Sequence, residues 1–349
     1  MKSKLPILAI TMGDPSGIGP EIIVKSLNEK SVYDICKPIV VGDADVMNSA
    51  LKIANSCLKV RAVKTVNDAE FKYGAIDVID LNCVDISELQ HGKVQAVSGR
   101  AAYLSVEKAI QLALNNEVDG TITSPLNKEA MNKAGYHYSG HTEIYAELTN
   151  TKDYTMMLAD GPLKVVHVST HVPLRKACDL VKKDRILKVI ELANEIMEDL
   201  GISNPLIGVA GLNPHAGENG IFGWEEEKEI EPAIVEAKQR GLNVEGPVPP
   251  DTLFSKAKGG QYDIVVAMYH DQGHIPLKVT GFVWNETKNK WESVSGVNIT
   301  LGLPIIRVSV DHGTAFGKAG KGTANHESLM NAIEYGAKLA NDRVARTNE

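Results

Sequence analysis

The stretch AITMGDPSGIGPEI, residues 9–22, places a glycine-rich turn between an apolar run and a helix pattern. No Gly-Lys-Ser/Thr triplet follows it, so it is not a Walker phosphate loop, and its glycines are not spaced as G-x-G-x-x-G. Pro20 suits the first turn of the following helix, and Glu21 is favourable near the positive end of the helix dipole. The stretch therefore predicts a tight turn that ends a first strand, and Asp14 is the side chain there that is worth mutating.

The same order, an apolar strand and then a helix, recurs along the 349 residues. Several of the apolar runs are continuous, as in strands that are covered on both faces. The runs span residues 5–11, 38–42, 119–124, 163–169, 205–211, 262–269 and 304–310. Amphipathic helix patterns lie between them, the clearest over residues 99–114 and 184–200. The alternation predicts an α/β protein with a mainly parallel sheet, and the length suggests two lobes.

Composition and charge exclude several classes of partner. Apolar residues make up 43% of the chain and charged residues 23%, which is ordinary for a soluble globular protein. The net charge is −7 and the lysines and arginines are scattered, which argues against nucleic acid or an anionic membrane as a partner. No window approaches the roughly 18 apolar residues of a membrane span. The 4 cysteines form no CxxC pair, which indicates a reduced, cytoplasmic compartment.

Three histidines, His171, His215 and His270, each follow the C-terminal end of an apolar strand. In open α/β sheets these loops converge on the ligand crevice, so the three imidazoles are expected to meet. Three imidazoles and an open position make a catalytic metal site, most naturally for Zn²⁺, with Co²⁺ or Ni²⁺ also suited. Asp251 and Asp271 are candidates to orient a ligand or assist proton transfer. The alternative is three unrelated loop histidines.

Polar residues elsewhere favour an anionic ligand. His141 and Thr142 precede a helix, whose first backbone N–H groups bind anions, although plain N-capping by Thr142 is an alternative. Arg307 lies inside an apolar strand and needs a partner, which is either an internal carboxylate or a ligand anion. Lys278 and Asn298 lie among the later strand ends.

Several motifs together resemble the 4-hydroxythreonine-4-phosphate dehydrogenase (PdxA-like) family. They are ITMGDPSGIGPEI, SPLNKEAMNKAGYHYSGHTE, VSTHVPLR, GLNPHAGENG, GPVPPDTLF, AMYHDQGHIPLK and GVNITLGLPIIRVSVDHGTAFGKAGKGTANHESL. They cover nearly the whole chain in order. The resemblance is closest to the branch that oxidises 4-phospho-D-threonate or 4-phospho-D-erythronate.

The resemblance implies a fold. The family belongs with the isocitrate and isopropylmalate dehydrogenases, and two stretches are similar to theirs, GDPSGIGPE near the N-terminus and HGTAFGKAGKGTAN at 312–325. The implied architecture is a two-domain α/β/α fold of that type, with a mainly parallel sheet and a cleft between the domains. Residues 1–130 plus 312–349 are expected to form the cofactor-side domain, and residues 131–311 the metal, substrate and dimerisation domain.

The resemblance also implies a site. One divalent metal is bound by His171, His215 and His270, with ligands from both chains of a homodimer. Substrate contacts are implied at His141, Thr142, Lys278, Asn298 and Arg307. Asp251 matches an active-site aspartate, and the implied catalytic residues are Asp251, His141 and Lys278. NAD contacts are expected at Gly13, Asp14, Gly313, Thr314, Ala315 and Asn325.

The implied reaction is oxidation of a hydroxyl β to a carboxylate by hydride transfer to NAD⁺, with loss of CO₂ and a divalent metal, Zn²⁺ or Mg²⁺, as cofactor. From 4-phosphothreonate it gives dihydroxyacetone phosphate. One alternative is 4-phosphohydroxy-L-threonine oxidation in pyridoxal phosphate biosynthesis. Alternatives of another class are a phosphate acyltransferase and a non-catalytic metal- or phosphate-binding protein.

One segment departs from the family pattern. Residues 279–297, VTGFVWNETKNKWESVSGV, are longer than the family's corresponding segment. Trp284 and Trp291 flank a polar turn, which predicts a short β-hairpin. The hairpin is either a flap over the phosphate end of the substrate or a surface decoration.

Overall fold

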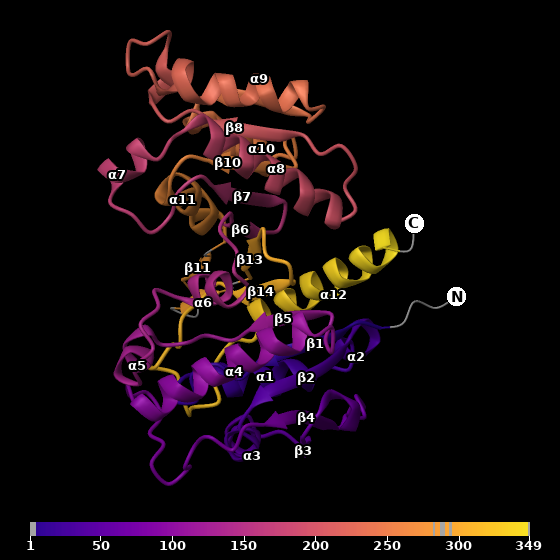
Figure 1. Cartoon of the computed structure of the whole chain (residues 1–349). Helices are drawn as coiled ribbons and strands as arrows, with labels where there is room; N and C mark the ends of the chain where they lie inside the picture. Colours follow the sequence, from indigo (N-terminus) through magenta and orange to yellow (C-terminus); the bar gives the residue numbers. More distant parts are fainter. Residues whose placement is uncertain (1–4, 282, 287–289, 293–294, 348–349) are drawn as a thin grey trace. The chain divides into compact units, whose positions relative to one another are not determined.

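The computed structural model describes residues 5–281, 283–286, 290–292 and 295–347 (Figure 1). The chain folds into two units, the first formed by Met1–Lys152 and Leu303–Glu349 and the second by Asp153–Gly302. Helix α6 (His141–Leu148) and strand β14 (Arg307–Val310) therefore belong to the first unit. The sequence had placed both in the second domain.

The sheet of the first unit has the strand order β3-β4-β2-β1-β5-β14, and all of its neighbouring strands pair in parallel. Its other strands are β1 (Ile7–Thr11), β2 (Lys37–Gly42), β3 (Lys59–Val63), β4 (Ala75–Asp80) and β5 (Gly120–Thr123). Its other helices are α1 (Gly19–Leu27), α2 (Val32–Ile35), α3 (Ala44–Ile53), η1 (Val66–Asp68), α4 (Ala96–Leu114), α5 (Lys128–Lys133) and α12 (Glu327–Thr347).

Helices cover both faces of this sheet. Successive side chains of a strand point to opposite faces. In β1, Ala9 belongs to the core that includes Val106 and Ile110 of α4, whereas Leu8 lies under Gly336 of α12. Both residues are fully buried, which explains the continuously apolar strand that the sequence shows.

The sheet of the second unit has the strand order β13-β6-β7-β10-β8-β9. Its strands are β6 (Thr155–Asp160), β7 (Leu163–His167), β8 (Ile207–Ala210), β9 (Val244–Val248), β10 (Ile264–Ala267) and β13 (Val297–Leu301). The β7-β10-β8-β9 portion is parallel, and β6 pairs antiparallel with both β7 and β13. The mainly parallel α/β fold is confirmed, and the antiparallel pairs are an addition that the sequence did not predict.

The helical segments of the second unit lie between these strands in the chain. They are α7 (Leu174–Asp179), α8 (Lys183–Asp199), η2 (Pro214–Gly217), η3 (Glu226–Ile230), α9 (Glu231–Gln239), α10 (Pro250–Lys258) and α11 (His270–Gly281). Leu253 of α10 and Leu277 of α11 pack with Val165 and Val265 of the central strands in one apolar core. Across all the described residues, helices are too short or too polar to span a bilayer.

The predicted hairpin is confirmed. Strands β11 (Val283–Asn285) and β12 (Lys290–Glu292) pair antiparallel, and Trp284 is opposite Trp291. Residues 287–289 of the polar turn lie outside the described residues. The choice between a flap and a surface decoration stays open.

Candidate active site

The opening turn, residues 12–18, contacts two other loops at the C-terminal edge of the first unit's sheet. The Asp14 backbone N–H donates to Pro125 O at 2.9 Å, and the Ile18 N–H donates to Thr314 O at 3.1 Å. A Cβ at Gly17 would lie 2.9 Å from the Thr314 Cβ, so only glycine allows this approach. The tight turn is as predicted, and it brings the sequence-predicted cofactor residues Asp14 and Thr314 to one edge of the unit.

Asp14 is a buried carboxyl group in this turn. Its Oδ1 accepts a hydrogen bond from the Ser16 N–H at 2.8 Å. Its Oδ2 is buried and has no hydrogen-bond partner in the described structure. Burial raises the pKa of Asp14 to about 7, against the opposing effect of the Ser16 bond. Near neutral pH the protonated form is therefore well populated, and it can donate a hydrogen bond to a ligand.

The other cofactor candidates lie in the loop between β14 and α12. Ala315 has a positive φ of 43°, and the Lys318 N–H closes a turn on Ala315 O at 2.8 Å. The Asn325 Oδ1 accepts from the Glu327 N–H at 2.8 Å, at the start of α12. Gly313 has no heavy atom within 4 Å of the position that a Cβ would take. The backbone at Gly313 is therefore open to close approach by a ligand.

Arg307 and His141 are close enough in the first unit for the Arg307 charge to act on the imidazole. The buried Arg307 guanidinium donates from Nε and Nη2 to Thr123 Oγ1, at 3.2 and 2.9 Å, and lies 5.7 Å from the Tyr145 ring. Burial lowers the pKa of Arg307 to about 10, partly offset by Tyr145 and Glu143, so the group stays charged. Burial and the Arg307 charge hold the pKa of His141 well below its usual range. The site thus offers a fixed cation and a neutral imidazole.

His141 also carries a buried Nε2 without a hydrogen-bond partner in the described structure. Helix α6 begins at His141 itself, its N-cap residue is Gly140, and no side chain caps it. The alternative that Thr142 is an N-cap is therefore wrong. An orphaned imidazole nitrogen next to a helix start and a guanidinium is suited to an anionic ligand such as a phosphate.

In the second unit, His171 and His270 lie together. They follow β7 and β10, which are adjacent parallel strands, and their ring centroids are 5.8 Å apart. With metal–nitrogen bonds of about 2 Å, two imidazoles on one ion have ring centres about 5 Å apart, so this pair fits a shared metal. The His270 Nδ1 lies 2.6 Å from Asp271 Oδ1, which leaves Nε2 as the candidate nitrogen for a metal.

His215 lies in a different environment. Its Nδ1 is 3.2 Å from Glu218 Oε2, and its side chain is 67% exposed. It borders a pocket of about 340 Å³ that is lined by Glu226, Glu227 and Glu231. Within the described parts of the chain, no three His, Cys, Asp or Glu side chains are grouped closely enough to hold a metal. One chain therefore brings together two of the three predicted ligands.

The remaining predicted residues also lie in the second unit. Asp251 is exposed on the first turn of α10, and Lys278 is on α11. Asn298 is on β13, with its Nδ2 3.9 Å from Met156 Sδ and a buried Oδ1 without a hydrogen-bond partner among the described residues. That orphaned acceptor is suited to a ligand hydroxyl or amine.

The stretch HDQGH at 270–274 contains supporting residues that the sequence analysis missed. Gln272 accepts from the Met268 N–H at 2.6 Å and donates to Gly211 O at 2.7 Å, so it joins the ends of β10 and β8. A Cβ at Gly273 would lie 2.4 Å from His167 Nε2. The His274 ring stacks on the His270 ring at 3.6 Å, and its Nδ1 lies 2.9 Å from His270 O. The close spacing of His270, Gln272 and His274 in the sequence was the signal that could have identified these supporting residues.

Several known proteins that this chain resembles along nearly its whole length are dehydrogenases. The D-threonate 4-phosphate dehydrogenase of Cupriavidus necator is 47% identical over 345 residues, which cover 99% of this chain and 100% of that protein. A relative from Oceanobacillus iheyensis, whose name proposes the same activity, is 50% identical over 342 residues, 97% of this chain and 99% of that protein. A solved 4-hydroxythreonine-4-phosphate dehydrogenase from Klebsiella pneumoniae is 44% identical, with a TM-score of 0.83 and coverage of 96% and 99%.

Fold, site and these matches define the chain as a dehydrogenase with a two-unit α/β architecture. The family described as "Pyridoxal phosphate biosynthetic protein PdxA" matches residues 34–336. The chain belongs to this PdxA family.

Proposed function

We propose that the protein oxidises and decarboxylates 4-phospho-D-threonate or 4-phospho-D-erythronate to dihydroxyacetone phosphate and CO₂, with NAD⁺ and a divalent metal. The observation that carries the proposal is the His171–His270 pair at two adjacent strand ends, with the His270 Nδ1 held by Asp271. The choice of substrate is supported by the whole-length similarity to a relative named D-threonate 4-phosphate dehydrogenase.

The residues present fit both groups. His171, His270 and His215 are the proposed metal ligands, and imidazole suits Zn²⁺ in a catalytic site. Asp14, Thr314 and Asn325 are proposed to contact NAD, together with the backbone of Gly13, Gly313 and Ala315. When bound, the metal supplies Lewis-acid polarisation of the substrate oxygens and NAD⁺ supplies the hydride acceptor.

The side chains of the protein orient the substrate and move protons. Arg307 is proposed to bind the phosphate or the carboxylate, since a guanidinium forms charge-assisted bonds with either group. His141 and Thr142 add neutral donors beside it, and Lys278 and Asn298 complete the substrate contacts. Because His141 is neutral at pH 7, its imidazole can accept a proton or donate one. Asp251 and Lys278 are the other candidates for proton transfer.

We further propose that the active enzyme is a homodimer in which His215 of a second copy completes the metal site. Large apolar side chains are exposed beside His171, at Val172 (38%) and Leu174 (62%). They are also exposed near His215, at Ile221 (71%), Phe222 (48%) and Trp224 (52%). Apolar surface of this kind is typical of an association surface.

The absence of disulfides among all 4 cysteines suits the proposed cytoplasmic location.

A complementation experiment tests the shared site. His215→Ala and His270→Ala chains are each expected to be inactive as homodimers. A heterodimer keeps one complete ligand set, from His171 and His270 of one chain and His215 of the other. Random mixing therefore restores about a quarter of the wild-type activity. If all three ligands came from one chain, mixing would restore nothing.

The reaction itself is tested by NADH absorbance with 4-phospho-D-threonate, 4-phospho-D-erythronate and 4-phosphohydroxy-L-threonine. Each is assayed with Zn²⁺, Mg²⁺, Co²⁺, Ni²⁺ or a chelator. We expect NADH with the first two substrates and its loss with the chelator. NADH with 4-phosphohydroxy-L-threonine alone would instead support pyridoxal phosphate biosynthesis, the second candidate, which the family description favours. No NADH with any substrate would refute the proposal.

A further inference from the structure

Helix α1 is tied to a distant loop by two of its side chains. Glu21 Oε1 accepts from Lys25 Nζ at 2.8 Å and from the Ala324 backbone N–H at 2.7 Å. Lys25 Nζ donates to Gly322 O at 2.9 Å and to Ala324 O at 2.7 Å. All three ammonium hydrogens of Lys25 are thus used. We call Glu21 and Lys25 the α1 clamp.

We propose that the α1 clamp is a positioning device that holds residues 313–325, the cofactor loop, in the conformation that binds NAD. This inference rests on the proposed function, because it takes the cofactor contacts at Gly313, Thr314, Ala315 and Asn325 from there. The clamp binds the loop at Gly322 and Ala324, and Ala324 directly precedes Asn325.

The geometry distinguishes the clamp from an ordinary surface ion pair. An exposed i,i+4 pair contributes little to stability and acts within its own helix. Here the Glu21 side chain is 2% exposed and the Lys25 side chain 21%. Their loop partners are about 300 positions away in the chain. Buried charge-assisted bonds of this kind fix the loop backbone far more strongly than a surface contact.

The opening turn, residues 12–18, leads directly into α1. Its Ile18 N–H donates to Thr314 O at the other end of the cofactor loop. The turn near Thr314 and the clamp near Ala324 therefore hold the loop near both of its ends. Without the clamp, the segment next to Asn325 loses its hydrogen bonds to α1.

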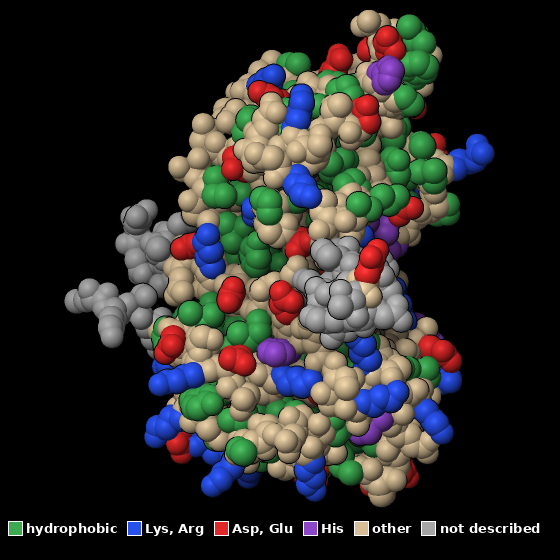
Figure 2. All heavy atoms as spheres, turned by 180° about the vertical axis from the view of Figure 1, so that it is seen from behind, with side chains coloured by type: hydrophobic (Ala, Val, Ile, Leu, Met, Phe, Trp, Pro, Cys, Tyr) green, Lys and Arg blue, Asp and Glu red, His purple; other side chains and the backbone are tan. Residues whose placement is uncertain are grey.

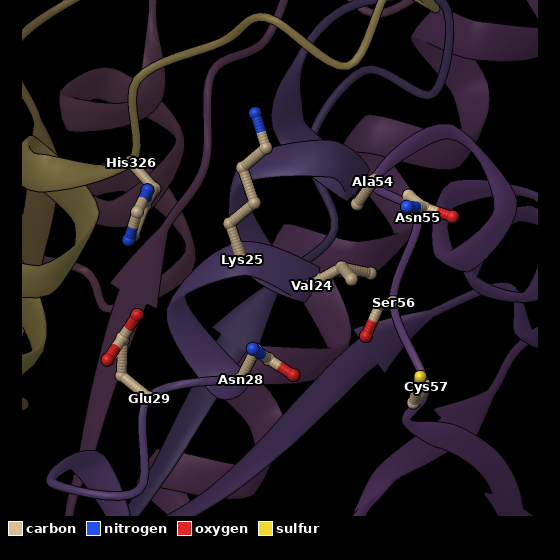
Figure 3. Close-up of a pocket in the computed structure, with 9 residues that line it drawn as sticks. All are labelled: Val24, Lys25, Asn28, Glu29, Ala54, Asn55, Ser56, Cys57 and His326. Atoms are coloured by element: carbon tan, nitrogen blue, oxygen red, sulfur yellow. The ribbon is translucent and has the colours of Figure 1, made fainter.

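A pocket borders the clamp at Lys25 and is also lined by His326, which follows the cofactor loop. The pocket is about 430 Å³ and lies between the ends of α1 and α3 and His326 (Figure 3). Figure 3 shows the Lys25 side chain extending away from Asn28 and Ser56, which line the same pocket. Lys25, whose ammonium group binds the loop, therefore lies at the border of this pocket.

The test compares Lys25→Met and the charge-free pair Glu21→Gln/Lys25→Met with the unaltered protein. In both variants we expect faster hydrogen exchange in a peptide spanning 318–326, and about a tenfold rise in the Kd and KM for NAD⁺, the size of one lost charge-assisted bond. The kcat and the KM for the phosphorylated substrate stay within about twofold. Lys25→Arg, which keeps the charge and the donors, restores most of the NAD⁺ affinity.

Lys133→Met is the matched control. It breaks an exposed i,i+4 pair with Glu129, at 3.0 Å in α5 of the same unit, and should change none of these quantities. Unchanged exchange and unchanged NAD⁺ affinity in both clamp variants would overturn the inference. So would a parallel rise in both KM values with a fall in Tm, which indicates general destabilisation. If the unaltered protein binds no NAD⁺, the proposed function fails, and the exchange data alone decide whether the clamp orders the loop.

Discussion

Replacing Asp14 by asparagine should stabilise the protein in a way that depends on pH. The pKa of Asp14 is raised by burial to about 7 from an ordinary value of 3.8. Between these values the unfolded chain loses the proton while the folded chain keeps it. The unfolded state then binds fewer protons, so the free energy of unfolding falls as pH rises through this window and is level above it. Asparagine does not titrate, so the variant avoids this loss.

The magnitude follows from the size of the pKa shift. The full shift corresponds to about 4 kcal/mol, since one pKa unit is about 1.4 kcal/mol. At about pH 5 the cost is about 2 kcal/mol and near pH 8 it is nearly the full amount, so the variant should gain about 2–3 kcal/mol between them. The variant keeps an acceptor for the Ser16 N–H, because the amide oxygen of asparagine can take the place of the Asp14 Oδ1.

Urea unfolding of the chelator-treated protein at the two pH values measures this difference. Asp85→Asn is the control, because the Ser87 hydroxyl and N–H lower the pKa of that exposed carboxylate. Replacing Asp85 must not produce a gain in the free energy of unfolding that grows with pH. Equal stability differences for Asp14→Asn at both pH values would show that Asp14 is ionised and solvated in the folded protein. The account of Asp14 as a protonated donor would then be wrong.

Further substitutions test the remaining parts of the site. Arg307→Met should lower kcat/KM for the phosphorylated substrate about 100-fold, because it removes a charge-assisted contact, while the Kd of NAD⁺ is unchanged. Asp271→Asn should weaken metal affinity about 10- to 100-fold, measured by chelator competition, since Asp271 orients His270. Gly273→Ala should lower the free energy of unfolding by about 1–3 kcal/mol, because the new Cβ meets His167. The role of Arg307 would be refuted by a change in kcat/KM below twofold, and that of Asp271 by a change in metal affinity below twofold. An unchanged urea midpoint would refute the account of Gly273.

The sequence predicts the parallel core because the physical signal is local. Strands such as β1, β5 and β10 are covered on both faces, so each is a continuous apolar run. Strands β3 and β9 are partly exposed, and their mixed composition hid them. The β6–β7 hairpin was missed for a different reason. Residues 156–159 are apolar, but β6 is joined to β7 by a connection of two residues, too short to mark two separate strands in the sequence pattern.

The number of charged residues is read from the sequence, but their distribution over the surface requires the structure. On the face drawn in Figure 2, Lys and Arg side chains lie among Asp and Glu side chains of the described residues. This intermixing agrees with the scattered pattern along the chain. The partners of buried charges were not readable in the same way. Glu21 seemed to serve only the dipole of its own helix, yet it accepts from Ala324, and nothing local in the sequence marks a contact about 300 positions away.

The three histidines show where strand-end reasoning stops. From the sequence, only the convergence of loops at the strand ends is predicted. The structure shows that β7, β10 and β8 are neighbours, so the residues after them start from one sheet edge. The chain after β8 then takes positive φ values at His215, Ala216, Glu218 and Asn219. The buried Glu226 carboxylate fixes the base of this loop by accepting from the N–H groups of Leu212 and Asn213, both at 2.8 Å. Left-handed backbone at non-glycine residues is costly and has no sequence signature here. Such strain is kept where it aims a side chain for function, and His215 carries it at the position from which it is proposed to reach a second copy of the chain.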